Sequence, residues 1–139
     1  MNILSEETEV PVKFSEVDSL KIVCHGHYVR YFEDGREAFG LKYGMGYMDI
    51  YQHGFTSPIV KVVCDYKRPL KYGDIAVVKA QYMDCDAAKL IFKFEIRRKS
   101  NLELIAIGET TQVLVDQNGD LSLTVPDFIQ EWKLRNNLR

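Results

Sequence analysis

Residues 27–43, HYVRYFEDGREAFGLKY, form the one long segment of this chain with helical periodicity. The apolar side chains that recur at helical spacing are Tyr28, Val29, Phe32, Phe39, Leu41 and Tyr43. Gly26 suits the N-cap, and Gly40 or Gly44 suits the left-handed residue that ends a helix. Gly35 lies inside, where glycine costs about 1 kcal/mol relative to alanine. We therefore expect a sheet to approach the helix closely at Gly35.

Downstream of this helix the pattern changes to a period of two, which indicates half-buried strands. Residues 89–99 are the clearest case, with Leu90, Phe92, Phe94 and Ile96 on one face and mostly charged side chains on the other. We expect strands at about residues 9–14, 59–70, 75–83, 89–99 and 102–115, a short strand after the turn at Asn118-Gly119, and a terminal helix at 126–134. One apolar helix face and one apolar sheet face must cover each other, which predicts an α+β fold.

Composition narrows the classes of protein to which the chain can belong. Its 139 residues predict a single domain over 1–139, and 18 basic against 20 acidic residues give no overall basic field for a nucleic-acid partner. No apolar run approaches the ~18 residues of a membrane span, and the N-terminus lacks a secretory pattern, so we expect a cytoplasmic protein. The three cysteines have no paired spacing, so we expect neither a metal site nor a disulfide framework.

Two strings of the sequence carry a family resemblance. They are VDSLKIVCHGHYVRYFEDGR, residues 17–36, and DYKRP followed by YGD within residues 65–74. Together they resemble the hotdog fold, and more narrowly the 4-hydroxybenzoyl-CoA thioesterase group and its bacterial acyl-CoA thioesterase relatives. The residues in register are Asp18, Ile22, Val23, His25, Tyr28, Glu33 and Arg36. The chain departs from the family pattern at Ser19-Leu20-Lys21 and at Gly26-His27.

The resemblance implies a fold, an activity and an assembly. The fold would be an antiparallel sheet of five or six strands wrapped around one long helix. The activity would be hydrolysis of an acyl-CoA thioester to free CoA and a carboxylic acid, with no cofactor because coenzyme A is part of the substrate. The assembly would be a homodimer, with homotetramers open, and with active sites at the subunit junction. An open sheet edge independently favours pairing with a second copy.

Thioester hydrolysis needs an attacking group and stabilisation of the negative charge that develops on the carbonyl oxygen. Asp18 can supply the first as general base or as nucleophile, and the sequence leaves both open. Backbone N–H groups at the helix start, around His25, can supply the second because the positive end of the helix dipole lies there. The resemblance assigns this task to the amide of His25, whose side chain has either a catalytic or a spectator role. Cys24 is more typical of a small apolar residue than of a nucleophile.

Four further residues are predicted to contact substrate. Tyr28 would be half core and half pocket wall. Ser57, like His53 before the long strand, would reach the acyl site of a partner subunit. Arg68 and Lys89 would contact the phosphates of coenzyme A. Glu33 and Arg36, three residues apart on the helix, are expected to pair with each other.

Two other functions compete with hydrolysis. A hotdog enoyl-thioester hydratase or dehydratase needs a carboxylate and a histidine around an enoyl thioester, and His25 or His53 would serve. A non-catalytic acyl-CoA or acyl-carrier binding protein would keep the fold without the chemistry, and the altered Ser19-Leu20-Lys21 loop motivates that hypothesis.

Overall fold

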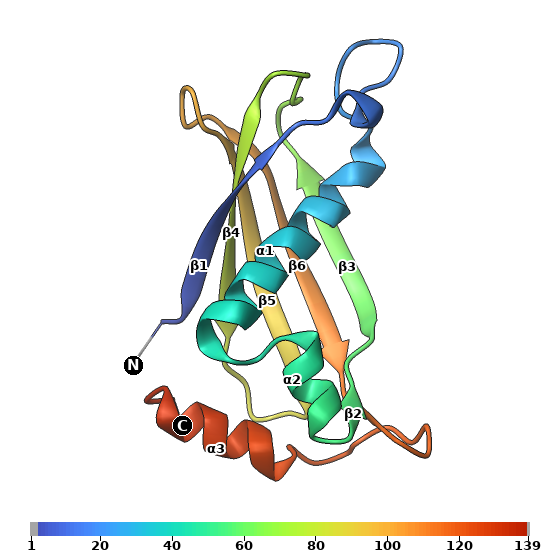
Figure 1. Cartoon of the computed structure of the whole chain (residues 1–139), viewed down its shortest axis with the longest axis vertical. Helices are drawn as coiled ribbons and strands as arrows, with labels where there is room; N and C mark the ends of the chain where they lie inside the picture. The colour runs from blue at the N-terminus through green and yellow to red at the C-terminus, as the bar shows by residue number, and fades with distance from the viewer. Residues whose placement is uncertain (1–2, 139) are drawn as a thin grey trace.

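A curved sheet and one long helix, α1 (Tyr28–Tyr43), form the two layers of the computed structural model, which describes residues 3–138 (Figure 1). The five-stranded sheet is antiparallel, in the order β1-β4-β5-β6-β3. Its strands are β1 (Ser5–Pro11), β3 (Ile59–Tyr66), β4 (Ile75–Met83), β5 (Lys89–Arg98) and β6 (Leu104–Val113). Two short strands, β2 (Phe55–Thr56) and β7 (Val115–Asp116), pair with each other outside this sheet. The remaining elements are the helices α2 (Tyr47–Gln52) and α3 (Asp127–Arg135) and the 3-10 turns η1 (Phe14–Glu16) and η2 (His25–His27).

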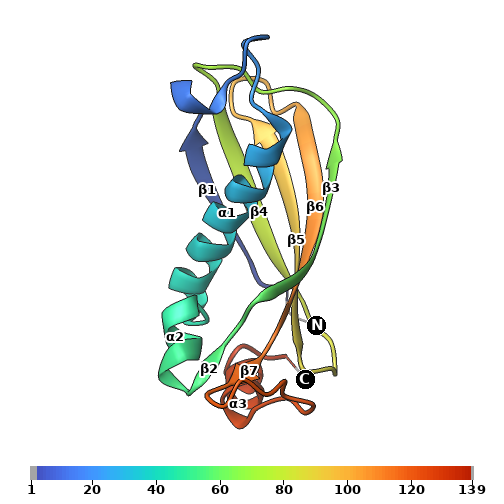
Figure 2. The same ribbon diagram turned by 90° about the vertical axis from the view of Figure 1, so that its right-hand side faces the viewer.

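All of α1 lies on one side of the sheet, and the alternation of buried and less buried residues along the central strands β4 and β5 explains why (Figure 2). Along β5 the side chains of Leu90, Phe92, Phe94 and Ile96 are buried, whereas Lys93 is exposed on the opposite face. Phe32 of α1 stacks on Phe94 with ring centroids 4.8 Å apart. The predicted α+β fold, with five strands around one long helix, is confirmed.

Close approach of the helix to the sheet depends on two glycines. A Cβ atom at Gly35 would lie 2.7 Å from Cγ1 of Val78, which confirms the expected reason for an interior helical glycine. A Cβ atom at Gly108 of β6 would lie 2.3 Å from the ring of Phe32. The helix therefore rests on the sheet at a separation that only these two residues permit.

Several element ends differ from the sequence-based expectation. Gly26 is not the N-cap of α1 but lies inside η2, and the helix ends at Gly44, whose φ is +71°. The predicted long strand ends at Tyr66 because the amides of Lys67 and Arg68 both donate to the carbonyl of Ile105, which turns the chain away. The strand expected over 102–115 is divided into β6 and β7, and the last expected strand is reduced to an isolated bridge.

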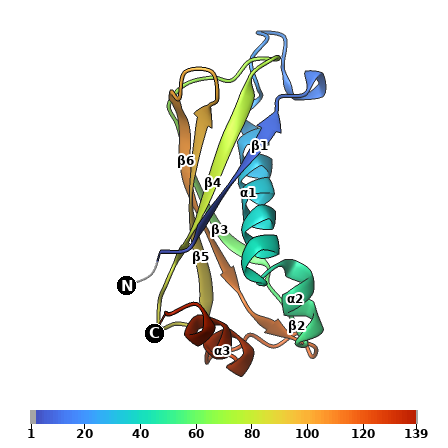
Figure 3. The same cartoon turned by 60° about the vertical axis from the view of Figure 1, so that its left-hand side comes forward.

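The Gly-rich region before β2 holds a helix that the sequence did not predict. In α2 the N-cap is Gly46, whose amide donates to Oδ2 of Asp49 at 2.8 Å. Helix α3 lies at one end of the sheet (Figure 3). Its Trp132 contacts the ring of Phe39 edge-on. No helix within residues 3–138 is long and apolar enough to cross a membrane.

Candidate active site

The loop between η1 and η2 is closed around Asp18. The amide of Asp18 donates to the carbonyl of Ile22, and the amide of Lys21 donates to the carbonyl of Asp18, both at 2.9 Å. Lys21 adopts a φ of +66°, which completes this tight turn. The carboxylate oxygen Oδ1 of Asp18 accepts a hydrogen bond from the amide of Leu20 at 2.8 Å, and the side chain is exposed. One carboxylate oxygen thus orients the loop, while the other has no partner within residues 3–138.

The helix start presents free backbone donors. The amides of His25 and Gly26 donate to no other group of the described chain, whereas the amide of His27 donates to the carbonyl of Cys24 at 2.9 Å. A Cβ atom at Gly26 would meet nothing within 4 Å, so the space beside the α-carbon of Gly26 is open. The hydroxyl of Tyr66 donates to the carbonyl of His25 at 2.9 Å and fixes the turn against β3. These donors have the positive end of α1 behind them.

Backbone contacts bring the Asp18 loop and the helix start to the same end of the molecule. An antiparallel bridge pairs Val17 with Val23. Asp18 follows Val17 directly and His25 follows Val23 by two residues, so the bridge holds the two segments together. The amide of Val23 donates to the carbonyl of Leu70 at 2.8 Å, so the loop is also tied to the connection between β3 and β4 (Figure 1). A carboxylate and a pair of free amides therefore share one end of the fold.

Tyr28 lies deeper than the sequence predicted. Its side chain is buried, and its hydroxyl accepts a hydrogen bond from the amide of Leu70 at 3.1 Å. Its ring contacts the rings of Tyr31 and Tyr66 edge-on. Burial raises the pKa of the Tyr28 hydroxyl above its ordinary value. A contact between Tyr28 and the substrate stays a prediction. Within the chain, the Tyr28 hydroxyl binds the backbone amide of Leu70.

Ser57 belongs to a buried polar network that the sequence did not reveal. Nε2 of Gln112 donates to the carbonyl and hydroxyl oxygens of Ser57 at 2.8 and 3.1 Å, and Nε of Arg36 donates to Oε1 of Gln112 at 2.9 Å. The expected pair between Glu33 and Arg36 is wrong: Arg36 is buried, Glu33 is exposed, and no ion pair joins them. The sequence did contain a sign that Arg36 is buried: it follows Phe32 by four residues and so lies on the same, buried face of α1.

The two predicted phosphate contacts lie at opposite ends of the sheet. Lys89 opens β5, whereas Nε of Arg68 lies 3.8 Å from Oε2 of Glu103, which also binds Arg98 at the other end of β5. Ten strand residues span roughly 30 Å at about 3.3 Å each. Both side chains are exposed. One subunit therefore cannot bring Arg68 and Lys89 to the same phosphate.

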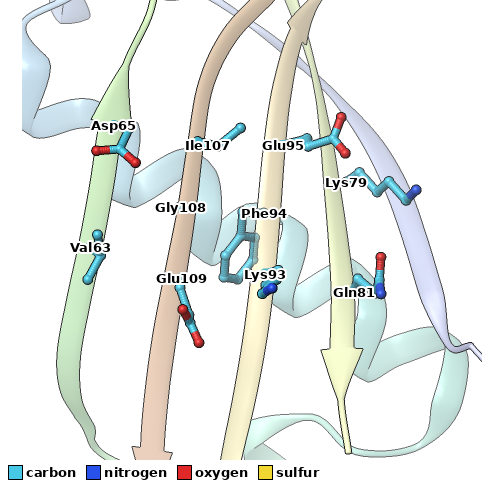
Figure 4. A pocket seen from close by; sticks show the side chains of 10 residues that line it. All are labelled: Val63, Asp65, Lys79, Gln81, Lys93, Phe94, Glu95, Ile107, Gly108 and Glu109. Carbon is cyan, nitrogen blue, oxygen red and sulfur yellow. The ribbon is translucent and has the colours of Figure 1, made fainter.

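A shallow hollow of about 310 Å³ lies on the sheet face that points away from α1. Figure 4 shows charged side chains projecting into it from neighbouring strands, among them Lys79, Lys93, Glu95 and Glu109. No predicted site residue lines this hollow. The candidate site is instead assembled from Asp18 and the helix start.

The known proteins that this chain resembles share its fold over nearly its whole length. A Bacillus subtilis (strain 168) protein named "Putative acyl-CoA thioesterase YneP" is 29% identical over 124 residues, which cover 89% of each chain. The structure of DHNA-CoA thioesterase from Staphylococcus aureus superposes with a TM-score of 0.83 at 23% identity, covering 96% of this chain and 91% of that one. The structure of Slr0204, a 1,4-dihydroxy-2-naphthoyl-CoA thioesterase from Synechocystis, also superposes with a TM-score of 0.83, at 18% identity over 97% and 99% of the two chains.

These two structural likenesses show the shared hotdog fold, and the family assignment rests on the sequence. The model of the Thioesterase-like superfamily matches residues 12–133, which include the Asp18 loop, the helix start and every strand except β1. The resemblance expected from residues 17–36 and 65–74 is therefore confirmed, and so is the expectation of an enzyme that hydrolyses thioesters. The chain belongs to the Thioesterase-like superfamily.

Proposed function

We propose that this enzyme hydrolyses acyl-CoA thioesters, with Asp18 as general base or nucleophile and the amides of His25 and Gly26 as donors to the carbonyl oxygen. The observation that carries the proposal is the pair of free amides at the helix start beside the Asp18 loop. The name of the Bacillus subtilis relative supports the acyl-CoA substrate. Donors fixed in this way act on charge as it develops, and removing one in a comparable site costs about 3 to 4 kcal/mol.

Two routes are consistent with this arrangement. As general base, Asp18 takes a proton from water, the water oxygen adds to the thioester carbon, and the C–S bond breaks to release CoA and the acid. As nucleophile, a carboxylate oxygen of Asp18 displaces CoA and forms a mixed anhydride, which water then hydrolyses. In both routes negative charge builds on the oxygen that the helix-start amides face.

The proposal includes a homodimer formed through β3. This strand is at the edge of the sheet, and Val60, Val62 and Val63 on it are 59%, 42% and 42% exposed. An edge strand with exposed apolar side chains is a template for pairing with another chain. A two-fold axis makes the two β3 strands antiparallel, so the end that carries His25 meets the end of the partner that carries Ser57.

Such a dimer explains the separation of the predicted substrate contacts. Each site would take Asp18, His25 and Arg68 from one subunit, because these lie at one end of the sheet. Ser57 and Lys89, which lie at the other end, would come from the partner subunit. The phosphates of coenzyme A would then meet basic side chains of both subunits.

The test is thiol release from short-chain, long-chain and aromatic acyl-CoAs by the parent and by Asp18→Asn. Loss of the attacking carboxylate should lower kcat by about 10²- to 10⁴-fold. Glu7→Gln, which changes an exposed carboxylate on β1 at the opposite edge of the sheet, is the matched control and should keep the parent rate. Equal rates in the parent and Asp18→Asn would remove Asp18 from the mechanism.

Two other results would point to the competing functions. Loss of crotonyl-CoA absorbance without free thiol would indicate a hydratase. Tight binding of CoA esters without turnover of any of them would indicate a binding protein.

A further inference from the structure

Arg36 is a buried cation without an adequate partner. Its side chain is 2% exposed, and Nε donates to Oε1 of Gln112 at 2.9 Å. Both Nη atoms are buried and have no hydrogen-bond partner within residues 3–138. The guanidinium lies over the rings of Phe92 and Tyr47, at 4.4 and 5.2 Å from their centroids. Burial of a charge is costly unless it is paired, so this arrangement calls for an acceptor from outside the subunit.

The nearby carboxylates of the chain do not supply that acceptor. Oδ2 of Asp49 accepts the amide of Gly46, and Glu33 is exposed to solvent. Neither forms an ion pair with Arg36. Burial lowers the pKa of Arg36 to about 10 although Tyr47 and Asp49 favour its charged form, so the guanidinium stays charged at neutral pH.

A narrow crevice leads to Arg36 between α1 and the start of β3. Its apolar walls are Val29, Phe32, Ile59 and Phe94, and Thr110 also lines it. The crevice holds about 10 Å³ in the single subunit, the room of one water-sized group. It has room for one oxygen atom of a ligand, and the rest of that ligand must lie outside.

The proposed dimer puts a thioester in front of this crevice. Pairing of the two β3 strands brings the Ile59 end of one subunit to the His25 end of the other. An acyl group held at the helix-start amides of the partner subunit would then point toward Ile59 and Arg36. The crevice and the predicted attacking carboxylate would belong to different subunits of one site.

We propose that Arg36 binds the terminal carboxylate of the acyl group, and that the substrates are CoA monothioesters of dicarboxylic acids. This inference rests on the proposed function. A carboxylate is ionised at neutral pH, so it neutralises the buried charge, and one of its oxygens can accept from the unpaired Nη groups of Arg36. A phenol is neutral at this pH, and an alkyl end leaves both Nη groups unpaired. Glu33 at the crevice mouth opposes an anion, and its exposure to solvent weakens that repulsion.

The experiment compares kcat/KM for glutaryl-CoA with that for valeryl-CoA, which has the same chain length and no terminal charge. The parent should prefer glutaryl-CoA, and Arg36→Met should lower that preference by about 10- to 100-fold, as expected for charge-assisted hydrogen bonds. Methionine fills a similar volume, and such replacement of a buried ion often preserves stability. Arg30→Met, an exposed arginine of the same helix, should keep the parent preference. Glu33→Gln should raise it.

Three outcomes separate this inference from the proposed function. Hydrolysis of both esters without a preference for glutaryl-CoA would overturn the inference and leave the function standing. A preference for 4-hydroxybenzoyl-CoA that Arg36→Met abolishes would also overturn the carboxylate assignment. If no acyl-CoA of the whole panel releases thiol, the function fails, and calorimetric titration with glutaryl-CoA decides the inference: binding that Arg36→Met weakens supports it, and equal binding by both proteins overturns it.

Discussion

Tyr28 shows how a residue can carry a family resemblance and still face the core. Its hydroxyl accepts the amide of Leu70, and this bond joins α1 to the connection after β3. Tyr28→Phe leaves that buried amide without an acceptor and should lower the free energy of unfolding by about 1 to 3 kcal/mol. The KM for acyl-CoA should stay near the parent value. Denaturant unfolding and steady-state kinetics on the same samples check both.

The opposite result for Tyr28→Phe is equally informative. A raised KM with unchanged stability would support the substrate contact predicted from the sequence. Tyr72→Phe is the control, because its ring is 63% exposed and lies at the same end of the sheet.

The local parts of the candidate site were predictable from sequence, and the long-range parts were not. Asp18 and His25 lie within one short segment, so the string around them was enough to select both. Arg36 and Gln112 are 76 residues apart, and only the pairing of α1 with β6 brings them together. The sequence suggested a surface pair of Arg36 with Glu33 because spacing along a helix says nothing about what lies across from it.

Among the elements, long periodic segments were predicted well and short ones were not. The helix at 27–43 and the strand at 89–99 each hide a whole apolar face, so their patterns are strong. Helix α2 has six residues in a Gly-rich region, too few to show a helical period. It forms because Gly46 and Asp49 close its first turn and Ile50 enters the core, contacts that tertiary structure selects.

The contact between α1 and β6 yields a stability prediction. At Gly108 a Cβ atom would lie 2.3 Å from the ring of Phe32 and 2.8 Å from the carbonyl oxygen of Val63, so Gly108→Ala forces helix and sheet apart. Overpacking of this kind costs about 1 to 3 kcal/mol. Gly26→Ala, where a Cβ atom meets nothing within 4 Å, should change the melting temperature little. Similar melting temperatures for the two variants would contradict the close approach.

For the molecule as a whole, buried tyrosines determine how the free energy of unfolding changes at alkaline pH. Burial raises the pKa values of Tyr28, Tyr31 and Tyr82 above the ordinary value of 10.0, and the hydrogen bond to Glu16 adds to the effect at Tyr31. Since the folded-state pKa is the higher one, the unfolded chain loses these protons first. The neutral tyrosines therefore add no pH dependence below about pH 10, and above it each lowers the free energy of unfolding by about 1.4 kcal/mol per pH unit.

Unfolding measured between pH 9 and 11, together with tyrosinate absorbance, checks this loss of stability. Tyr82→Phe should reduce the slope, because the hydroxyl of Tyr82 has no partner within residues 3–138 and its removal costs little else. Tyr72→Phe should leave the slope unchanged, since Tyr72 is exposed. Ionisation of all eight tyrosines at their ordinary pKa in the folded protein would contradict the prediction.

A dimer whose sites combine both subunits predicts complementation between two defective chains. In each proposed site, Asp18→Asn removes the attacking carboxylate that one subunit supplies, and Arg36→Met removes the acyl contact that the other subunit supplies. A heterodimer of these two variants, purified through two different tags, keeps both residues together in one of its two sites. It should hydrolyse glutaryl-CoA at about half the parent rate, because one site of a two-fold pair is intact. Either homodimer alone should remain defective. If each site lay within a single subunit, every site of the heterodimer would carry one of the two defects, and its rate would not exceed the mean of the two homodimers.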